Sequence, residues 1–411
     1  MKMFWMAAFA VIVPLGTGAA FAEPMTFDAA LKRASEAPSL RGRDASVAAA
    51  RSSAIAADRL PDPTLDVGLK DFPVTGPDAG QFNRDNFTMT TIGVSQQFTN
   101  PAKRRARAAL AAAGIGVAEA DRLIEARAVQ LETALAWIDV YYGQKRLALL
   151  QTLDASLDDL QKTVSARLAS GSARPSQALE PAQLRAQVID RRATLVSEIA
   201  RARAKLVRFT GDPDPQTAGD PPAPMVDGAR LRASLGALPA LRARDAATLS
   251  AEAQTGLARA DKHPDWTVSA SYGRREPAFG DLVSVGVSMD LPLFAKRRQD
   301  PKIAAAASEA ARTRFDREAA EREWAAALDA DLAEHAMHHQ RLENARNTLV
   351  PLARQRATLD RDSYAAGKTD LGTALLATLS VAEADVDLLD REAEVARDAV
   401  RINITYAGDD R

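Results

Sequence analysis

One short stretch of the chain occurs twice: residues 92–105 read IGVSQQFTNPAKRR, and residues 285–298 read VGVSMDLPLFAKRR. The Gly-Val-Ser and Ala-Lys-Arg-Arg segments of the two stretches match in register. Upstream of them, Pro61-Asp62-Pro63 in the first half corresponds to Pro264-Asp265-Trp266 in the second. Landmarks that recur in the same order indicate a duplicated structural unit.

The segment 211–228 separates the two copies. It is rich in proline and glycine, which disrupt both helices and strands. We therefore expect a first repeat at residues 23–210, a linker at 211–228 and a second repeat at 229–411. Each repeat should hold a helix, a β-hairpin and a long helical hairpin; the β-hairpins lie at about 64–98 and 265–291, and the helical hairpins at about 101–210 and 296–403.

Hydrophobic periodicity supports this plan. Apolar residues within 131–168, 184–206 and 375–400 recur at near-heptad steps, a pattern typical of long helices that pack against a neighbouring helix. Each repeat is expected to open with one continuous helix, Thr26–Arg59 in the first and Ala229–Lys262 in the second. The sequence thus predicts a mainly α-helical fold with a small β part.

The expected strands alternate between apolar residues and small or polar ones. Leu65, Val67 and Leu69 alternate with polar residues or glycine, as do the valines of 283–291. One apolar face and one polar face are typical of a transmembrane β-barrel, although a soluble β-subdomain has the same pattern. A barrel in lipid must close, and four strands cannot; two chains would supply eight strands and three chains twelve.

The N-terminus has the features of a secretory signal peptide over residues 1–22. Lys2 precedes an apolar run from Met3 to Leu15, and Ala20-Phe21-Ala22 forms a small-residue cleavage site. The chain has no cysteine, so disulfides, thiolate metal sites and a lipid-modified N-terminal cysteine are excluded. We expect export by a cleaved signal without a lipid anchor.

Composition narrows the possible function. The chain has 53 basic and 54 acidic residues, and this balance argues against a nucleic-acid-binding protein. It has four histidines and none of the glycine-rich phosphate-binding or nucleophile motifs of common enzymes. We expect neither an enzyme nor a bound cofactor.

The twofold repeat of helix, β-hairpin and long helical hairpin resembles the TolC family of outer-membrane efflux channels. The segments that carry the resemblance are Leu60-Pro61-Asp62-Pro63, the Gly-Val-Ser strand before Ala-Lys-Arg-Arg, and Tyr364-Ala365-Ala366-Gly367. It implies a homotrimer with an α-helical tunnel and one shared twelve-stranded transmembrane β-barrel. Such a protein is a passive exit duct in the outer membrane of a Gram-negative bacterium, in contact with outer-membrane lipid and with a long periplasmic part.

The segments DFPVTGPD at 71–78 and FTMT at 87–90 look similar to the heavy-metal branch of that family, which serves copper/silver or cobalt/zinc/cadmium efflux. The resemblance implies a tripartite system with a periplasmic adaptor protein and a proton-driven inner-membrane pump, and heavy-metal cations as the transported substrate. The alternative is a soluble periplasmic coiled-coil or adaptor-type interaction protein without a pore.

By position in the family, the adaptor meets the two turns that join the helices of each long hairpin: Gly171, Ser172, Ala173 and Arg174, and Gly367, Lys368, Thr369 and Asp370. Many family members carry a ring of acids near the second turn that narrows the tunnel. Here those positions are Thr373 and Leu376, so the candidate gate residues are instead Glu180 and Asp370.

Three histidines, His335, His338 and His339, lie close together near Asp331 and Glu334. Imidazoles at helical spacing share a face and can bind a divalent metal. The spacing of Leu328, Leu332, His335, His339 and Leu342 offers a different interpretation, in which two of the histidines belong to a packing interface.

Basic clusters, Ala102–Arg105 and Ala295–Arg298, follow the returning strand of each repeat. Positive charge at the start of a helix is unfavourable to the helix dipole, so its appearance in both copies suggests a use. The clusters are expected either to meet lipid phosphates or to remain solvated.

Overall fold

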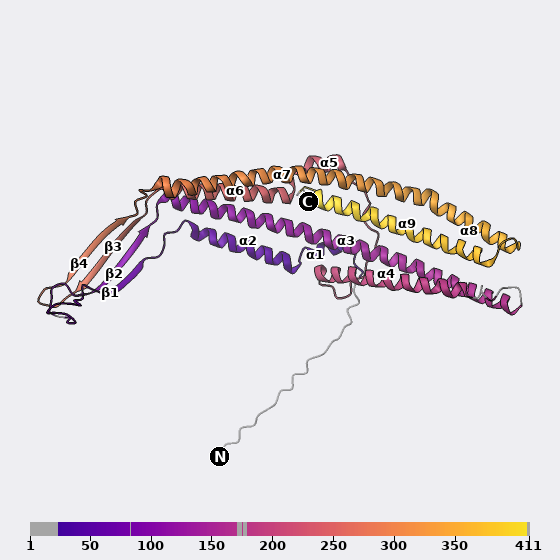
Figure 1. The fold of residues 1–411 in the computed structure, drawn as a ribbon, viewed down its shortest axis with the longest axis horizontal. Coiled ribbons are helices and arrows are strands. Elements are labelled where there is room, and N and C mark those ends of the chain that lie inside the picture. Colours follow the sequence, from indigo (N-terminus) through magenta and orange to yellow (C-terminus); the bar gives the residue numbers. More distant parts are fainter. Residues whose placement is uncertain (1–23, 83, 171–174, 176–178, 409–411) are drawn as a thin grey trace, which may run out of the picture.

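The computed structural model describes residues 24–82, 84–170, 175 and 179–408. The molecule is elongated, with a small sheet at one end and helices that run from it to the opposite end, here called the tip (Figure 1). The predicted signal peptide, residues 1–22, lies outside the described residues. The prediction of a mainly helical fold with a small β part is confirmed.

The first repeat is built on a very long helix, α3 (Pro101–Ala169), of 69 residues. At about 1.5 Å per residue such a helix spans about 100 Å. Its start is set by Asn100, whose side chain accepts a hydrogen bond from the Ala102 amide, and by Pro101 in the first turn. The chain returns through α4 (Glu180–Thr210), which ends at Gly211 in the left-handed conformation, φ 71°.

The second repeat has the same plan with one irregularity. Helices α7 (Ala295–Asn344) and α8 (Val350–Ala365) are joined by a π-helical turn, Ala345–Leu349, and α9 (Leu371–Tyr406) returns from the tip. Pro351 follows this turn. Because proline has no amide hydrogen to donate, a wider turn before it accommodates the missing hydrogen bond.

The expectation of one continuous helix at the start of each repeat is wrong. The structure has α1 (Phe27–Ala34) and α2 (Pro38–Ala57) in the first repeat, and α5 (Gly228–Ser234), a 3₁₀ turn (Leu235–Ala237) and α6 (Pro239–Ala260) in the second. The cause is Pro38 and Pro239. Each drives the preceding residue, Ala37 or Leu238, out of the helical region to ψ 144° or 136°.

Four strands form one antiparallel sheet in chain order: β1 (Thr64–Lys70), β2 (Met89–Phe98), β3 (Trp266–Arg274) and β4 (Leu282–Met289). The central pair, β2 and β3, joins the two repeats, with Thr90 opposite Arg274 and Phe98 opposite Trp266. The outer edges of β1 and β4 have no partner strand within the described residues.

The core lies at mid-length, where the linker crosses the helices. Trp137 is fully buried and stacks on Tyr141, and its indole nitrogen donates to the Met25 carbonyl at 2.9 Å. Met25 also exchanges backbone hydrogen bonds with Gln216 and Ala218 of the linker. The linker is therefore fixed against the start of the first repeat. In the described part of the chain, no helix is both long and apolar enough to cross a membrane.

Candidate functional site

The register of the sheet places the apolar residues of all four strands on one face. Val67 lies opposite Ile92, Ile92 opposite Tyr272, and Tyr272 opposite Val283. The other face carries mainly serine, threonine and glycine, together with Asp66, Lys70, Met89, Gln97 and Leu282. The apolar side chains are largely exposed: 69% for Val67 and 73% for Val285. An exposed apolar sheet face of this extent marks a surface that meets lipid or a partner.

A buried ion pair joins the two repeats where the sheet meets the helices. Lys103 Nζ, at the start of α3, lies 2.9 Å from Asp265 Oδ2, just before β3, and both side chains are nearly buried. The Asn100 amide donates to Asp265 Oδ1 at 2.8 Å. Burial raises the pKa of the Asp265 carboxyl, but the Asn100 amide and Lys103 outweigh it and hold this pKa below 3.8. Asp265 is therefore ionised and holds the start of α3 against the start of β3. This contact and the β2–β3 strand pair are together called the joint between the repeats.

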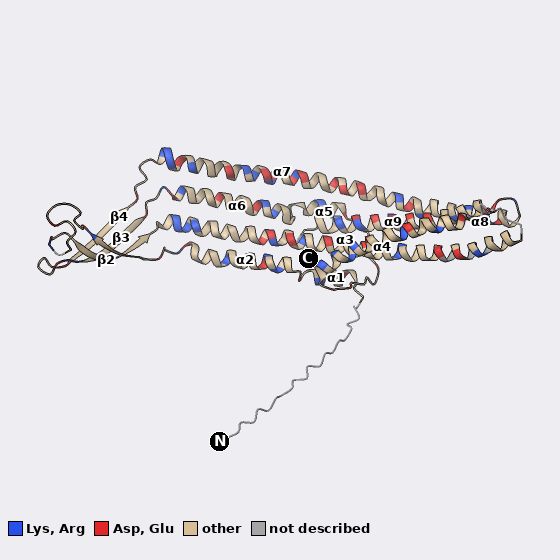
Figure 2. Ribbon diagram, turned by 60° about the horizontal axis from the view of Figure 1, so that its bottom comes forward, with Lys and Arg blue, Asp and Glu red and all other residues tan. Residues whose placement is uncertain are grey.

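The two basic clusters differ in their surroundings. In the first, Lys103 pairs with Asp265, and Arg104 donates to the Asp58 carbonyl at 2.8 Å. In the second, Lys296, Arg297 and Arg298 are all exposed. Figure 2 shows both clusters where α3 and α7 leave the sheet. For Lys103 neither expectation, lipid phosphates or solvation, describes what the structure shows, because this side chain forms an ion pair inside the molecule.

The second predicted docking turn, residues 367–370, lies at the tip (Figure 1). Gly367 has φ 73°, a conformation that favours glycine, and its amide donates to the Tyr364 carbonyl. Lys368 is exposed and Thr369 half-buried, and Asp370 caps α9 by accepting from the Thr373 amide at 2.8 Å. The predicted docking residues Gly171, Ser172, Ala173 and Arg174 lie outside the described residues.

The structure brings the two candidate gate acids together. Glu180 begins α4 and Asp370 precedes α9; a Cβ placed on Gly372 would lie 2.9 Å from Glu180 Oε2 and 3.2 Å from Asp370 Oδ1. Both carboxylates therefore border Gly372. Within the described residues, Glu180 Oε2 is buried without a hydrogen-bond partner. Two acids at adjacent helix N-termini create a local negative charge at the tip.

The three histidines do not point to one centre. His338 Nδ1 lies 2.6 Å from Asp398 Oδ2 of α9, while the rings of His335 and His339 form a T-shaped contact with their centroids 6.4 Å apart. The packing interpretation placed His339 at the helix interface, but the side chain there is His338, 14% exposed against 48% for His339. In the described part of the chain, no cluster of histidine and acidic side chains is arranged to hold a metal ion.

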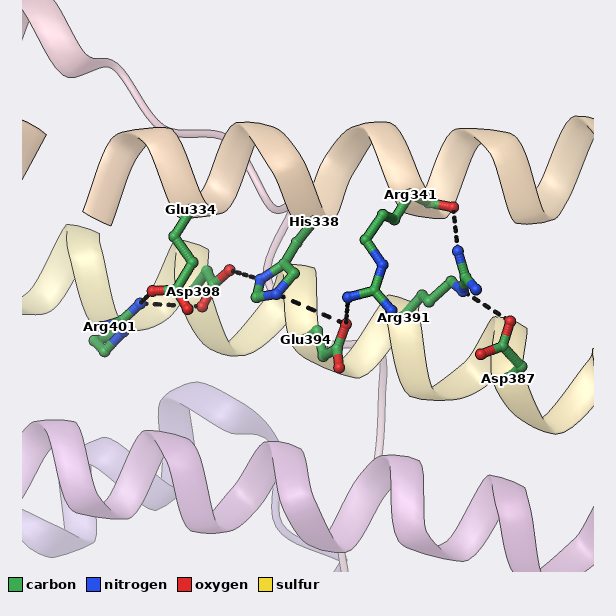
Figure 3. A network of polar contacts seen from close by, with 8 residues as sticks. All are labelled: Glu334, His338, Arg341, Asp387, Arg391, Glu394, Asp398 and Arg401. Carbon is green, nitrogen blue, oxygen red and sulfur yellow. Dashed lines mark hydrogen bonds and ion pairs between the residues drawn. The ribbon is translucent and has the colours of Figure 1, made fainter. Parts of the chain in front are cut away.

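His338 belongs instead to a polar network between α7 and α9 (Figure 3). Arg401 of α9 reaches Glu334 at 3.1 Å and Asp398 at 3.2 Å, and Arg391 donates to the Arg341 carbonyl at 2.9 Å. Sequence analysis missed Asp398 and Arg401. Their spacing of three residues on the returning helix, opposite the histidines in the hairpin, is the signal that points to them.

Comparison with known proteins places these features in context. Residues 231–404 match the family model described as outer membrane efflux protein. No curated protein matches the chain.

Several solved structures share the fold. A membrane protein from Pseudomonas aeruginosa superposes with a TM-score of 0.79 at 16% identity, over 93% of this chain and 90% of that one. The structure of CusC, which concerns conformational changes in folding and transmembrane channel formation, superposes with a TM-score of 0.78 at 14% identity. The match covers 93% of this chain and 92% of CusC. The MtrE outer membrane channel of Neisseria gonorrhoeae, in its open state, superposes with a TM-score of 0.76 at 16% identity. The match covers 93% of this chain and 89% of that one. The chain thus has the fold of these channel proteins over nearly its whole length.

Proposed function

We propose that this protein is the outer-membrane exit duct of a tripartite efflux system. The observation that carries the proposal is the exposed apolar face of a four-stranded sheet, set at one end of helices about 100 Å long. The family match over residues 231–404 and the fold of outer membrane channels support it. In this proposal the chain conducts passively and is not an enzyme.

The assembly is proposed to be a homotrimer. Three copies would supply twelve strands for one closed barrel in the outer membrane of a Gram-negative bacterium, with the apolar face toward lipid and the serine-rich face toward a lumen. The helices extend through the periplasm as a tunnel. Export requires the predicted signal peptide, residues 1–22, with no lipid anchor.

The tip is proposed to meet a periplasmic adaptor, through Gly171, Ser172, Ala173 and Arg174 and through Gly367, Lys368, Thr369 and Asp370. The adaptor connects the duct to a proton-driven inner-membrane pump. Glu180 and Asp370 are proposed as the gate, because both carboxylates border Gly372 at the tip. Heavy-metal cations are proposed as the substrate, on the likeness of 71–78 and 87–90 to the heavy-metal branch.

The test is membrane fractionation followed by mass determination in detergent and conductance in a planar bilayer. We expect a trimer in the outer-membrane fraction that forms steady channels. A soluble monomer or dimer in the periplasm contradicts the proposal and favours the adaptor-type alternative. Deletion of the gene should lower tolerance to a panel of copper, silver, cobalt, zinc and cadmium salts; unchanged tolerance to all five contradicts the substrate.

A further inference from the structure

The internal repeat makes it possible to deduce how one copy of the chain contacts the next. The strand register within the first repeat is reproduced in the second: Thr64 pairs with Ser95, and their equivalents Thr267 and Ser288 pair with each other. Both threonines follow a Pro-Asp landmark, and both serines end Gly-Val-Ser. The sequence equivalences are therefore structural equivalences, strand by strand.

Among the residues that the structure describes, the joint between the repeats has no counterpart. Its strand pair, β2 with β3, has Val94 opposite Ala270. The equivalents of these residues are Val287 on β4 and Val67 on β1, which lie on the two unpaired edges of the described sheet. The joint's ion pair, Lys103 with Asp265, has Lys296 and Asp62 as its equivalents, and both are exposed. The two ion-pair side chains are nearly buried between the repeats, whereas their equivalents at the outer edges of the sheet are exposed.

The helices show the same asymmetry. In the described part of the chain, α6 packs extensively against both α3 and α7, whereas α2 packs extensively against α3 alone. Thr255 of α6 is 5% exposed. Its equivalent on α2, Ser52, is exposed. The outer side of α2 therefore lacks a neighbour of the kind that α6 has.

We propose that a second copy of this chain occupies both free edges, with β4 of one copy paired antiparallel to β1 of the next in the register that sets Val287 opposite Val67, and with Lys296 of one copy paired with Asp62 of the next. The helix α7 then covers α2 of the next copy. This contact is head-to-tail, and its repetition closes a ring when the rotation from one copy to the next fits a whole number of copies, as it does in the proposed trimer. The inference rests on the proposed trimer, to which it adds the register and the ion pair.

The absence of cysteine from the chain makes the register directly testable. Opposite residues of antiparallel strands have Cα atoms about 4.5–5.5 Å apart, within the range of a disulfide. We expect Val67→Cys with Val287→Cys to give a covalent trimer on a non-reducing denaturing gel after oxidation in the membrane. The internal equivalent, Val94→Cys with Ala270→Cys, should give a disulfide within one chain and no change in oligomer mass.

A two-residue slip is the control for register. Leu69→Cys with Val287→Cys places the sulfurs on a diagonal with Cα atoms about 7–8 Å apart, where a disulfide is strained. We expect at least tenfold less cross-linked trimer than from the Val67 pair. Equal or greater cross-linking of the slipped pair overturns the proposed register. A conducting trimer in which the Val67 pair does not cross-link overturns the inference but leaves the proposed function intact; a soluble monomer overturns both.

The ion pair has its own test by charge reversal. Asp62→Lys and Lys296→Asp should each lower the recovery of trimer in detergent several-fold, and the double variant should restore it. Recovery that the single variants leave unchanged, or that the double variant fails to restore, contradicts the ion pair. Arg298→Asp, an exposed residue of the same cluster, controls for a general effect of charge.

Discussion

At the scale of single residues, Gly93 shows how closely the central strands approach. A Cβ at this position would lie 2.9 Å from the Ser271 Cβ and 3.2 Å from the Ala270 carbonyl oxygen. The neighbouring atoms belong to the backbone and to the first atom of a side chain, so they cannot move aside freely. Gly93 is therefore required by the pairing of β2 with β3, which holds the two repeats together.

We predict that Gly93→Ala destabilises the protein by about 1–3 kcal/mol, the usual cost of overpacking. The measurement is the thermal unfolding midpoint of the purified protein in detergent. Gly114→Ala is the matched control, because a Cβ on Gly114 of α3 meets nothing within 4 Å. An unchanged midpoint for Gly93→Ala would show that the strands separate more easily than the structure indicates.

His335 gives a prediction about pH. Its burial lowers the pKa of the imidazole below 6.5, although the charge of Asp398 raises that pKa in part. The folded state therefore favours neutral His335. Its stabilising contribution is complete above pH 6.5 and is lost as the pH falls from there through the folded-state pKa, because the unfolded chain takes up the proton first.

We predict that the free energy of unfolding of the wild type declines more steeply between about pH 7 and pH 5 than that of His335→Gln. Chemical denaturation across this range measures the difference. His339→Gln, which alters a side chain 48% exposed, should follow the wild type. Parallel curves for wild type and His335→Gln would contradict the prediction.

At the scale of elements, the sequence could predict what depends on local pattern. The alternation at 65–69 lies in β1, and the register confirms that its apolar residues share a face with those of the other strands. The breaks at Pro38 and Pro239 were also readable, since proline restricts the residue before it. They were missed because the hydrophobic periodicity continues across them. Contacts between distant segments without such a local signal, such as Lys103 with Asp265, depend on tertiary packing and could not be predicted.

The joint between the elements α3 and β3 should depend on its ion pair. We predict that Lys103→Met destabilises the protein by about 3 kcal/mol, since the nearly buried Asp265 carboxylate loses its cation. Adding Asp265→Asn should recover part of this loss, because a neutral amide oxygen can still accept from the Asn100 amide. Thermal unfolding measures both variants. Arg105→Met, at an exposed neighbour, serves as control, and an equal loss from it would show that the pair has no special role.

At the scale of the whole molecule, the two ends of the described part differ in character: an apolar sheet face lies at one end, and charged residues, among them Lys368 and Asp370, lie at the other. The acids that border Gly372, Glu180 and Asp370, belong to different repeats and begin the two returning helices. They are candidates from the sequence only because the positions that carry acids in many family members hold Thr373 and Leu376 here. Their proximity depends on tertiary packing, which brings the starts of α4 and α9 together at Gly372.

We predict that Glu180→Gln with Asp370→Asn reduces cation selectivity, because acidic rings at a constriction favour cations. The reversal potential of single channels in a potassium chloride gradient should move toward zero. Asparagine preserves the cap of α9, so folding is retained. Glu198→Gln, at an exposed position farther along α4, is the control. A reversal potential unchanged in the double variant would place the constriction elsewhere.

The middle of the molecule has a practical value for engineering. Met25 is bonded to the linker beside Trp137, and Gly408 lies against Ser234, so the described chain both starts and finishes at mid-length (Figure 1). An affinity tag or a fluorescent protein attached close to Gly408 would lie near mid-length. It would leave both extremities clear, so a labelled version should serve for purification and imaging without obstructing either the sheet or the turns.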